Sequence, residues 1–485
     1  MIAIKKIAAC AQLTGATALF CLNAHAALPI EHWQLPGGAQ VYLVSTQALP
    51  IVDVQIDFDA GSRRDPPEQA GLASVTAGMV EKGVRASGCA PAAAAPAPEA
   101  GRAVSAAAPV APAAPVALTT APCEPALDQN ALGEAWADLG AMFGVGAGMD
   151  RMSFTLRTLA QPALLDKAVA LAAREIGEPA FPEDVWQRER ERIGAALKEA
   201  NTKPGTIAGR RFAQAVYGSH PYGQQTTEAT LARIDVADMR RRYAQGVVPC
   251  RAKVSIVGAV TRAQAERIAT TLLSRLPATV EAAARCEPAP PVAEVAALGA
   301  PVEERIPFDA AQAHVLIGQP GYPYRDPDRF ALNVGNYVLG GGSLVSRLTE
   351  EVREKRGLAY SVYSAFSPGL HGGAFRIYFQ TRPDQADEAL KVAREVLARY
   401  VAEGPTPAEV KAAKDNLIGG FPLLIDSNRD LLGNVANIAW NDLPLDYLDT
   451  WTKRMAAVTV ADVKAALARK LQPQRMVTVI VGAKP

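Results

Sequence analysis

The chain has 485 residues, of which 49% are hydrophobic, and this is enough for two or more domains with substantial cores. Its 50 basic and 49 acidic side chains leave a net charge of +1, which gives no electrostatic reason to expect nucleic acid or a membrane surface as a partner. Beyond the N-terminal stretch, no run is long and apolar enough to be a membrane span.

Residues 1–26 are predicted to be an export signal. Lys5 and Lys6 precede an apolar stretch, and Ala-His-Ala at 24–26 has the small-x-small pattern that a signal peptidase cleaves. We expect cleavage after Ala26 and a periplasmic mature protein, with a retained membrane anchor as the alternative. The "IAAC" at 7–10 resembles a lipoprotein cleavage box, but it lies too close to the lysines to leave an apolar segment before it.

A helix is predicted within "GLASVTAGMVEKGV" at 71–84, with Leu72, Val75 and Met79 on the face that packs on the core. Next comes "GCAPAAAAPAPEAGRAVSAAAPVAPAAPVALTTAPCEP" at 88–125, which is almost entirely Ala, Pro, Val and Gly. Such a stretch has no periodicity and cannot build a core, so we interpret 90–126 as an inserted loop.

Four cysteines remain after the signal, an even number for an oxidising compartment. Cys89 and Cys123 stand at the two ends of the insert, and we predict that they form a disulfide at its base. The alternative is free or differently paired thiols, and the pairing of Cys250 and Cys286 cannot be deduced from the sequence. None of them has the CxxC spacing of a zinc site.

The remaining segments alternate between strand and helix patterns. An alternating strand is predicted at 153–159 and buried strands at 254–260 and 477–485, while residues 277–303 have the composition of a linker. Amphipathic helices, several with Pro near the start, are predicted at 162–177, 182–201, 262–276, 383–404 and 406–421.

Two pairs of segments indicate an internal repeat. "IDFDAGSRRDP" at 56–66 resembles "VLIGQPGYPYRDP" at 315–327, with Arg-Asp-Pro copies 261 positions apart. "VSIVGAV" at 254–260 resembles "VTVIVGAKP" at 477–485, with Ile-Val-Gly copies 224 apart. The two offsets differ by 37, and residues 90–126 number 37, so removing the insert brings the copies into register.

The repeat predicts an α+β protein of two homologous domains, each a mainly antiparallel sheet with helices packed on one face. We place the first domain at 27–279, a linker at 280–303 and the second domain at 304–485. In the second domain, "SRLTEEVREKRGLAYSVYS" at 346–364 is predicted to change from a charged helix to a strand after Gly357, with Arg353 and Tyr360 on either side of the break.

This doubled layout resembles the pitrilysin-type zinc peptidases, the M16 or insulinase-like family, in particular their processing-peptidase-like branch. The resemblance implies a clam-shell fold and a His-x-x-Glu-His zinc motif on a helix of the first domain. The segment 71–84 fits that frame, but the histidine positions are Ser74 and Gly78 and the glutamate position is Ala77. None of these can bind zinc or move a proton, and Glu199, near the expected third ligand, does not make a site alone.

The second domain does fit the family. Its frame Ser-Arg-Leu…Arg…Gly-Leu-x-Tyr is present with Arg353 and Tyr360 seven residues apart. In the family these side chains hydrogen-bond the substrate backbone near the scissile carbonyl, and guanidinium and phenol donors suit a carbonyl that gains negative charge. The alternative is an ordinary solvated Arg and a half-buried Tyr.

The resemblance therefore implies a substrate-binding subunit without zinc of its own. We expect a heterodimer with a homologous exported chain that carries zinc and the general base, acting on peptides. The competing hypothesis is a pseudopeptidase that binds extended peptides as a chaperone or scaffold, and a homodimer with neither activity is a third possibility.

Other motifs give less evidence of function. "LGGGSLVSRL" at 339–348 lacks the Gly-Lys-Ser/Thr of a phosphate loop, and we interpret it as a turn that lets a peptide backbone approach or as a plain connection. The mature chain has four histidines, His32, His220, His314 and His371, and none falls in a metal-ligand pair. The peptide substrate and the role of the insert are not deducible.

Overall fold

A computed structural model describes residues 29–89, 123–277, 286 and 289–483. The predicted signal peptide, most of the predicted insert and part of the predicted linker lie outside these residues, so the proposed domain limits stay predictions. None of the helices within the described residues has the length and apolar character needed to cross a bilayer.

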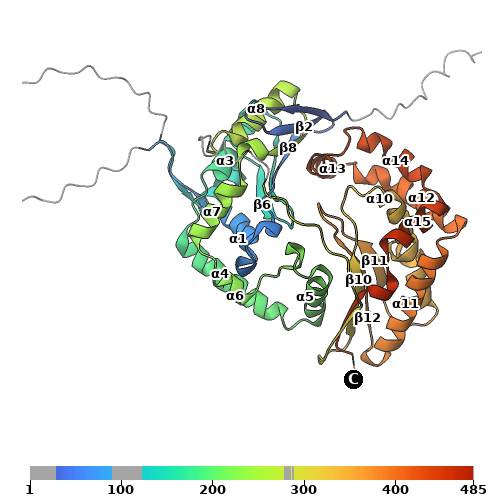
Figure 1. The fold of residues 1–485 in the computed structure, drawn as a ribbon. Helices are drawn as coiled ribbons and strands as arrows, with labels where there is room; N and C mark the ends of the chain where they lie inside the picture. The colour runs from blue at the N-terminus through green and yellow to red at the C-terminus, as the bar shows by residue number, and fades with distance from the viewer. Residues whose placement is uncertain (1–28, 90–122, 278–285, 287–288, 484–485) are drawn as a thin grey trace, which may run out of the picture.

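Two mixed sheets form the two halves of the molecule (Figure 1). The first has six strands in the order β1 (Glu31–Gln34), β2 (Gln40–Ser45), β8 (Lys253–Gly258), β3 (Ile51–Phe58), β7 (Met152–Leu159) and β6 (Met142–Ala147). The second has five in the order β11 (Val362–Phe366), β12 (Ala374–Thr381), β10 (Ala313–Pro320), β13 (Val477–Val481) and β9 (Val302–Ile306). Each contains one parallel pair, β2 with β8 and β13 with β9, and is otherwise antiparallel, as the sequence predicts.

Helices of each half cover one face of its own sheet. The first half uses α1 (Leu72–Val80), α3 (Pro162–Gly177), α4 (Glu183–Ala200), α7 (Val236–Gly246) and α8 (Arg262–Leu273), with the smaller α2 (Gln129–Asp138) and α6 (Glu228–Leu231) beside them. The second uses α10 (Arg329–Asn336), α11 (Ala386–Glu403), α12 (Pro407–Gly420), α14 (Tyr447–Ala457) and α15 (Val460–Lys470). The predicted helices at 162–177, 182–201 and 406–421 agree with α3, α4 and α12 within one residue at each end.

The repeat is visible in where the elements begin. α3 and α11 begin at Pro162 and Ala386, α4 and α12 at Glu183 and Pro407, α7 and α15 at Val236 and Val460, and β8 and β13 at Lys253 and Val477. Every one of these pairs is 224 positions apart, which is the offset that the Ile-Val-Gly copies have in the sequence. The two halves therefore share one element order after the insert.

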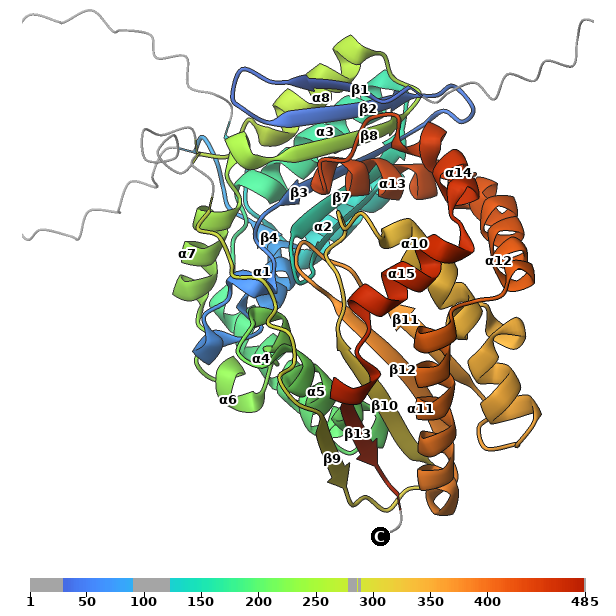
Figure 2. The same cartoon turned by 45° about the vertical axis from the view of Figure 1, so that its right-hand side comes forward.

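The halves also exchange a helix, which the sequence did not predict. α5 (Pro204–Tyr217) belongs to the first half but packs on β10 and β13 of the second sheet, while α13 (Asn428–Trp440) belongs to the second half but packs on β8, β3 and β2 of the first. Figure 2 shows α13 lying across the first sheet and α5 beside the second. The helices of one half thus cover one face of its sheet, as predicted, and a helix of the other half covers the opposite face.

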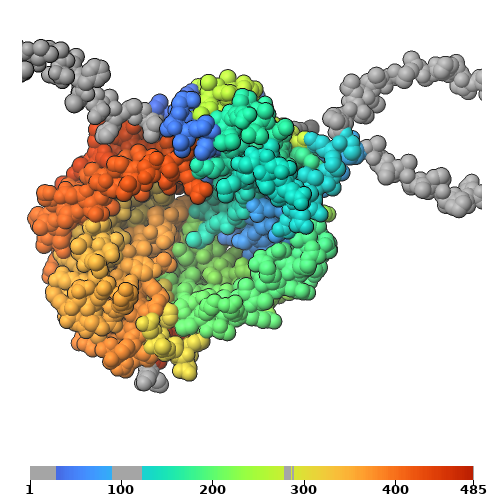
Figure 3. Space-filling view, turned by 180° about the vertical axis from the view of Figure 1, so that it is seen from behind, coloured from blue at the N-terminus to red at the C-terminus, as the bar shows by residue number. Residues whose placement is uncertain are grey.

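Apolar side chains explain both placements. Ala208, Phe212 and Val216 of α5 pack in one buried cluster with Leu316 of β10 and with Val477 and Val479 of β13. On the other side, the outward face of the first sheet, with Tyr42, Val44 and Val257, joins the core of the second half beneath Val435, Ile438 and Ala439 of α13. Seen from behind, the two halves lie side by side with a hollow where they face each other (Figure 3).

Candidate peptide-contact site

Arg353 and Tyr360 lie next to each other in the structure. Arg353 is on a helical turn, Thr349–Glu354, that has the wide π-helical winding, a rare geometry that is frequent at functional positions. Gly357 ends this helix with φ +62°, and its N–H donates to Arg353 O at 2.8 Å. The guanidinium carbon of Arg353 lies 5.1 Å from the ring centre of Tyr360.

The strand of this corner begins later than the sequence predicts. We expected the strand to follow Gly357 directly, but β11 begins at Val362, so Tyr360 stands in the connection before the strand. Leu358 and Ala359 are buried, and Tyr360 is 82% exposed. Because this connection is not paired with a neighbouring strand, the phenol of Tyr360 points away from the core instead of being half-buried in the sheet.

A small cavity of about 250 Å³ lies beside this pair. Its walls are the helical turn, the start of β11 and the glycine-rich segment, with Gly340, Gly341, Ser343, Leu344, Thr349, Arg353, Ser361, Val362, Tyr363 and Ser364 as lining residues. A Cβ on Gly340 would lie 2.4 Å from Ser364 N, so only glycine lets this segment approach β11 so closely. Leu344 and Val345 next to it are 62% and 77% exposed.

The charges around Arg353 are mostly satisfied within the same turn. Its Nε lies 3.2 Å from Glu354 Oε1, while Lys355 and Arg356 both pair with Glu351 and hold the pKa of that carboxyl at about 2. Arg353 keeps a side chain that is one-third exposed, with several N–H donors in a fixed plane. Together with the phenol of Tyr360, it presents hydrogen-bond donors at the surface.

The degenerate motif lies on α1, where the sequence places it. Leu72, Val75 and Met79 are buried, so the helix packs on the core as predicted. Ser74 and Gly78 face solvent and Ala77 is buried, and none of these three residues supplies the imidazole or carboxylate that a zinc site of this motif needs. Glu199 pairs with Lys203 at 2.7 Å in an exposed turn. In the described part of the chain, no three His, Cys, Asp or Glu side chains lie close enough together to hold a metal ion.

Two histidines that are distant in sequence come together between the halves. The rings of His220 and His371 lie 5.2 Å apart, and Tyr222 beside them donates its hydroxyl to Asp150 Oδ1 at 2.6 Å. The His371 ring also lies 3.5 Å from Glu294 Oε2 of the linker. Sequence reasoning missed this cluster because its members are on four separate segments; its hydrogen bonds connect the halves to each other and to the linker.

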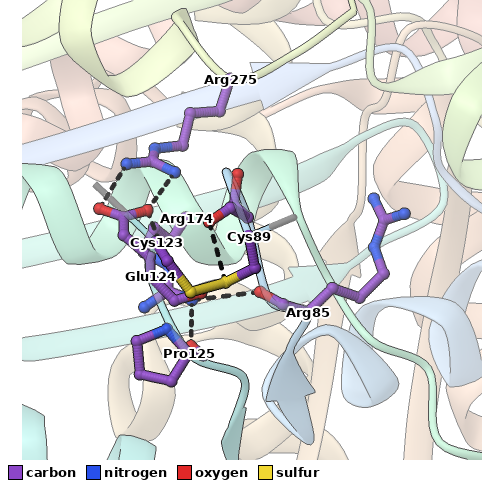
Figure 4. Close-up of a disulfide and its surroundings, with 8 residues drawn as sticks. Arg85, Cys89, Cys123, Glu124, Pro125, Arg174 and Arg275 are labelled. Atoms are coloured by element: carbon purple, nitrogen blue, oxygen red, sulfur yellow. Dashed lines mark hydrogen bonds and ion pairs between the residues drawn. A yellow bond between two sulfur atoms is a disulfide. The ribbon is translucent and has the colours of Figure 1, made fainter. Parts of the chain in front are cut away.

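The structure joins Cys89 to Cys123, the pair predicted from the sequence, and it also joins Cys250 to Cys286. Figure 4 shows the first disulfide beside Glu124, which pairs with Arg275 at 2.6 Å. Arg174 donates to the backbone oxygens of Arg85 and Pro125. These bonds fix both ends of the segment that contains the insert.

Comparisons with known proteins identify the family. The sequence profile of the peptidase M16 inactive domain matches residues 233–417. A crystal structure of a peptidase M16 inactive domain from Pseudomonas fluorescens is 30% identical, with a TM-score of 0.81, and the match covers 94% of this chain and 98% of that one. This chain belongs to the M16 peptidase family.

Two further proteins, both named as proteases, extend the comparison. An uncharacterized zinc protease of Streptomyces coelicolor is 31% identical over 296 residues, which is 60% of this chain but only 63% of the length of that relative. The periplasmic protease PqqL of Escherichia coli has the same fold, with a TM-score of 0.73 at 17% identity over 94% of this chain and 46% of that chain. This chain thus shares its fold with PqqL, while the metal ligands of the His-x-x-Glu-His motif are missing from α1 of this chain.

Proposed function

We propose that this chain is the non-catalytic subunit of a heterodimeric, periplasmic M16 metallopeptidase. In this complex Arg353 and Tyr360 bind the peptide substrate, and a homologous partner chain supplies zinc and the general base. One observation carries the proposal: Arg353 and Tyr360 lie together at the surface, beside a cavity, in a chain whose motif positions are Ser74, Ala77 and Gly78.

The chemistry of the pair suits peptide hydrolysis. When water attacks a peptide carbonyl, negative charge develops on the carbonyl oxygen, and fixed donors nearby stabilise this charge more in the transition state than in the substrate. The guanidinium of Arg353 and the phenol of Tyr360 are such donors. The cavity between the glycine-rich segment and β11 leaves room for a substrate backbone, and the exposed Leu344 offers an apolar contact for a substrate side chain.

Export to the periplasm is part of the proposal. It is supported by the predicted signal at 1–26, by two disulfides, which persist in oxidising compartments, and by the likeness of the fold to a periplasmic protease.

The competing function is peptide binding without cleavage. It is favoured by the match to a domain described as inactive and by the absence of metal-ligating groups on α1. Both functions use the same surface around Arg353 and Tyr360, so peptide binding alone does not distinguish them.

The deciding experiment is co-expression with a homologous exported chain that a neighbouring gene encodes. Zinc content and cleavage of a quenched peptide are then measured for each chain and for the complex. We expect zinc on the partner and activity only in the complex. Arg353→Ala or Tyr360→Phe should lower kcat by about 10²-fold, as loss of one oxyanion donor does, whereas Arg356→Ala, which removes an exposed arginine three positions away, should not.

Three outcomes would count against the proposal. If no complex forms, or if a complex cleaves peptides equally well with Arg353→Ala, the chain is at most a peptide binder. If this chain alone takes up one equivalent of zinc and cleaves peptide, the first half has been misread.

A further inference from the structure

The face of the second sheet that α5 covers continues past this helix onto β12 and β11. α5 packs on β10 and β13, and Tyr378 of β12 packs against the same apolar cluster as a partly buried side chain. Because side chains two positions apart on a strand share a face, Arg376 lies on this face as well. Arg376 is exposed, and Tyr363 and Tyr378 are half-buried, so this part of the sheet is open to solvent.

Arg376 has aromatic and small neighbours instead of acidic ones. Its partners on the adjacent strands are Gly318 of β10 and Ala365 of β11, which carry no charge. The guanidinium carbon of Arg376 lies 6.0 Å from the ring centre of Tyr363, and the ring of Tyr363 lies 5.6 Å from that of Tyr378. Arg376 forms no ion pair with a carboxylate of the described part of the chain.

A carboxylate on this side of the sheet, that of Asp150, is already engaged. Burial raises the pKa of Tyr217 at the end of α5, and the charge of Asp150 adds to this rise while that of Arg376 opposes it. Asp150 accepts the hydroxyl of Tyr222 at 2.6 Å and lies 3.4 Å from Arg63 Nε. Asp150 therefore has its own partners and does not serve as the counter-ion of Arg376.

The first half has a carboxylate at the place that corresponds to Gly318. Gly318 is 261 positions after Asp57, which is the offset of the Arg-Asp-Pro copies. On β3 and β7, Asp57 stands opposite Ser153, accepts its hydroxyl and pairs with Arg151 at 2.9 Å. On β10 and β12, Gly318 stands opposite Arg376. The second sheet thus has an arginine, and no acid, at the pair of positions where the first sheet has a paired aspartate.

Tyr363 connects Arg376 to the site around Arg353 and Tyr360. It lines the cavity beside Arg353, and its ring is the one that the guanidinium of Arg376 faces. From Tyr360 to Ala365, which stands opposite Arg376, the chain advances by a length of at most about 17 Å. An extended peptide whose backbone is held at Tyr360 therefore brings a group about five residues away to Arg376.

We infer that Arg376, with Tyr363 and Tyr378 beside it, is a second contact of the peptide site and selects peptides that carry a carboxylate about five residues from the scissile bond. This inference rests on the proposed function, because it assigns a substrate class to the same site. A guanidinium held beside aromatic rings keeps its planar fork available, and this fork matches a carboxylate through two N–H donors. An Asp or Glu side chain and the C-terminus of a peptide both supply that carboxylate.

The test is fluorescence anisotropy of labelled peptides with the mature chain at low ionic strength, where charge interactions are least screened. The peptides have about ten residues, amidated C-termini and one variable residue near either end, which is Glu, Gln or Lys. We expect the Glu peptide to bind about three- to tenfold more tightly than the Gln peptide, and the Lys peptide to bind least. A Gln peptide with a free C-terminus measures the contribution of that carboxylate, and a gain larger than that of Glu would support the inference with the C-terminus as the recognised group.

Three variants separate the charge at 376 from other effects. Arg376→Gln should remove the preference for Glu and leave the affinity for the Gln peptide unchanged, and Arg376→Glu should make the Lys peptide the tightest. Arg353→Ala should weaken all the peptides alike, because it removes a contact to the peptide backbone. Arg399→Gln, which removes an exposed arginine on α11 of the same half, should change nothing. Because Arg376 is exposed, its variants should keep the Tm of the wild type.

The outcomes distinguish this inference from the proposed function. If the chain binds the peptides but does not prefer Glu over Gln, or if Arg376→Gln keeps the full preference, the inference is overturned while the proposed function stands. A preference that Arg399→Gln loses as well would overturn it too, because net charge would then be the cause. If neither the chain nor its complex with the zinc-bearing partner binds any of the peptides up to about 1 mM, the inference and the proposed function both fail.

Discussion

The exchanged helices α5 and α13 occupy equivalent places in the repeat, but they are held differently. α5 puts the large ring of Phe212 against the second sheet, where a Cβ on Gly318 would lie 2.7 Å from its ring. The residue 224 positions later is Ala436, and α13 is held instead by Val435, Ile438 and bonds from Lys253 to the backbone at Ala439. One repeated unit therefore supports two different interfaces, one centred on an aromatic ring in a small cluster and the other continuous with a large core.

Phe212→Ala tests this difference with the largest expected effect. Removal of a buried phenylalanine costs about 3–5 kcal/mol, and here the lost contacts join the two halves. The free energy of unfolding in urea should fall by that amount, and the exposed Gln214→Ala on the same helix should change it by less than about 0.5 kcal/mol. A loss of under about 1 kcal/mol would mean that α5 is not held by its aromatic contact.

The disulfides are a second difference between the halves, because the second half contains no cysteine. Replacing Cys250 and Cys286 with serine opens a loop with a sequence separation of 36 and should cost about 2–4 kcal/mol. Urea melts with and without reductant measure this. The reductant should destabilise the wild type more than the double variant, which retains only Cys89–Cys123, and an equal loss in both would contradict a contribution from the Cys250–Cys286 bond.

The halves also differ in a buried titratable group, Glu175 of the first half. It is buried, accepts a hydrogen bond from Trp136 Nε1, and burial raises its pKa from 4.5 to about 7, with Glu81 adding to the rise; Tyr243 also faces it. The folded state keeps a proton that the unfolded state releases, so the free energy of unfolding falls as the pH rises through this window. The residue 224 positions later, Arg399, is exposed.

Glu175→Gln removes that titration and still accepts from Trp136. We expect little change at pH 5 and a gain of about 1–3 kcal/mol over the wild type at pH 8. Urea melts across this range measure the difference. A constant difference between the two proteins at all pH values would show that Glu175 does not titrate in this window.

The smallest expected effect is at Gly78, one of the former ligand positions. It is an exposed glycine inside α1, and a Cβ there would meet no atom within 4 Å. Gly78→Ala should stabilise the chain by about 0.5–1 kcal/mol, seen as a rise in the urea midpoint. Destabilisation would mean that an unseen neighbour, such as a partner chain, occupies this face.

The regular elements were predictable because their signals are local. The amphipathic pattern at 162–177 and the proline at its start specify α3 without reference to any other segment. The repeat was predictable because the offsets of the Arg-Asp-Pro and Ile-Val-Gly copies differ by the length of the insert. The structure gives the starts of α3 and α11 the same offset of 224 positions. The family resemblance came from the doubled layout together with the motif frames at 71–84 and 346–360. In the structure the guanidinium carbon of Arg353 lies 5.1 Å from the ring centre of Tyr360.

What the sequence could not predict depends on partners far along the chain. Nothing in α5 indicates that Phe212 packs on the sheet of the other half, because an apolar face does not specify which surface covers it. The pairing of Cys250 with Cys286 and the meeting of His220 with His371 join residues that are 36 and 151 positions apart, which no local pattern indicates. The late start of β11, at Val362 instead of directly after Gly357, accompanies the burial of Leu358 and Ala359 in the connection.

The helix exchange also determines the order in which the two halves can fold. α5 ends at Tyr217, and β10, on which it packs, begins at Ala313, 96 positions later, while β13, the other strand beneath α5, begins at Val477. Until both strands are in place, Phe212 has no surface to cover it, so the first half cannot complete its fold before the second half has formed its sheet. A folding intermediate with only the first half formed exposes this aromatic ring to any chaperone that binds aromatic segments.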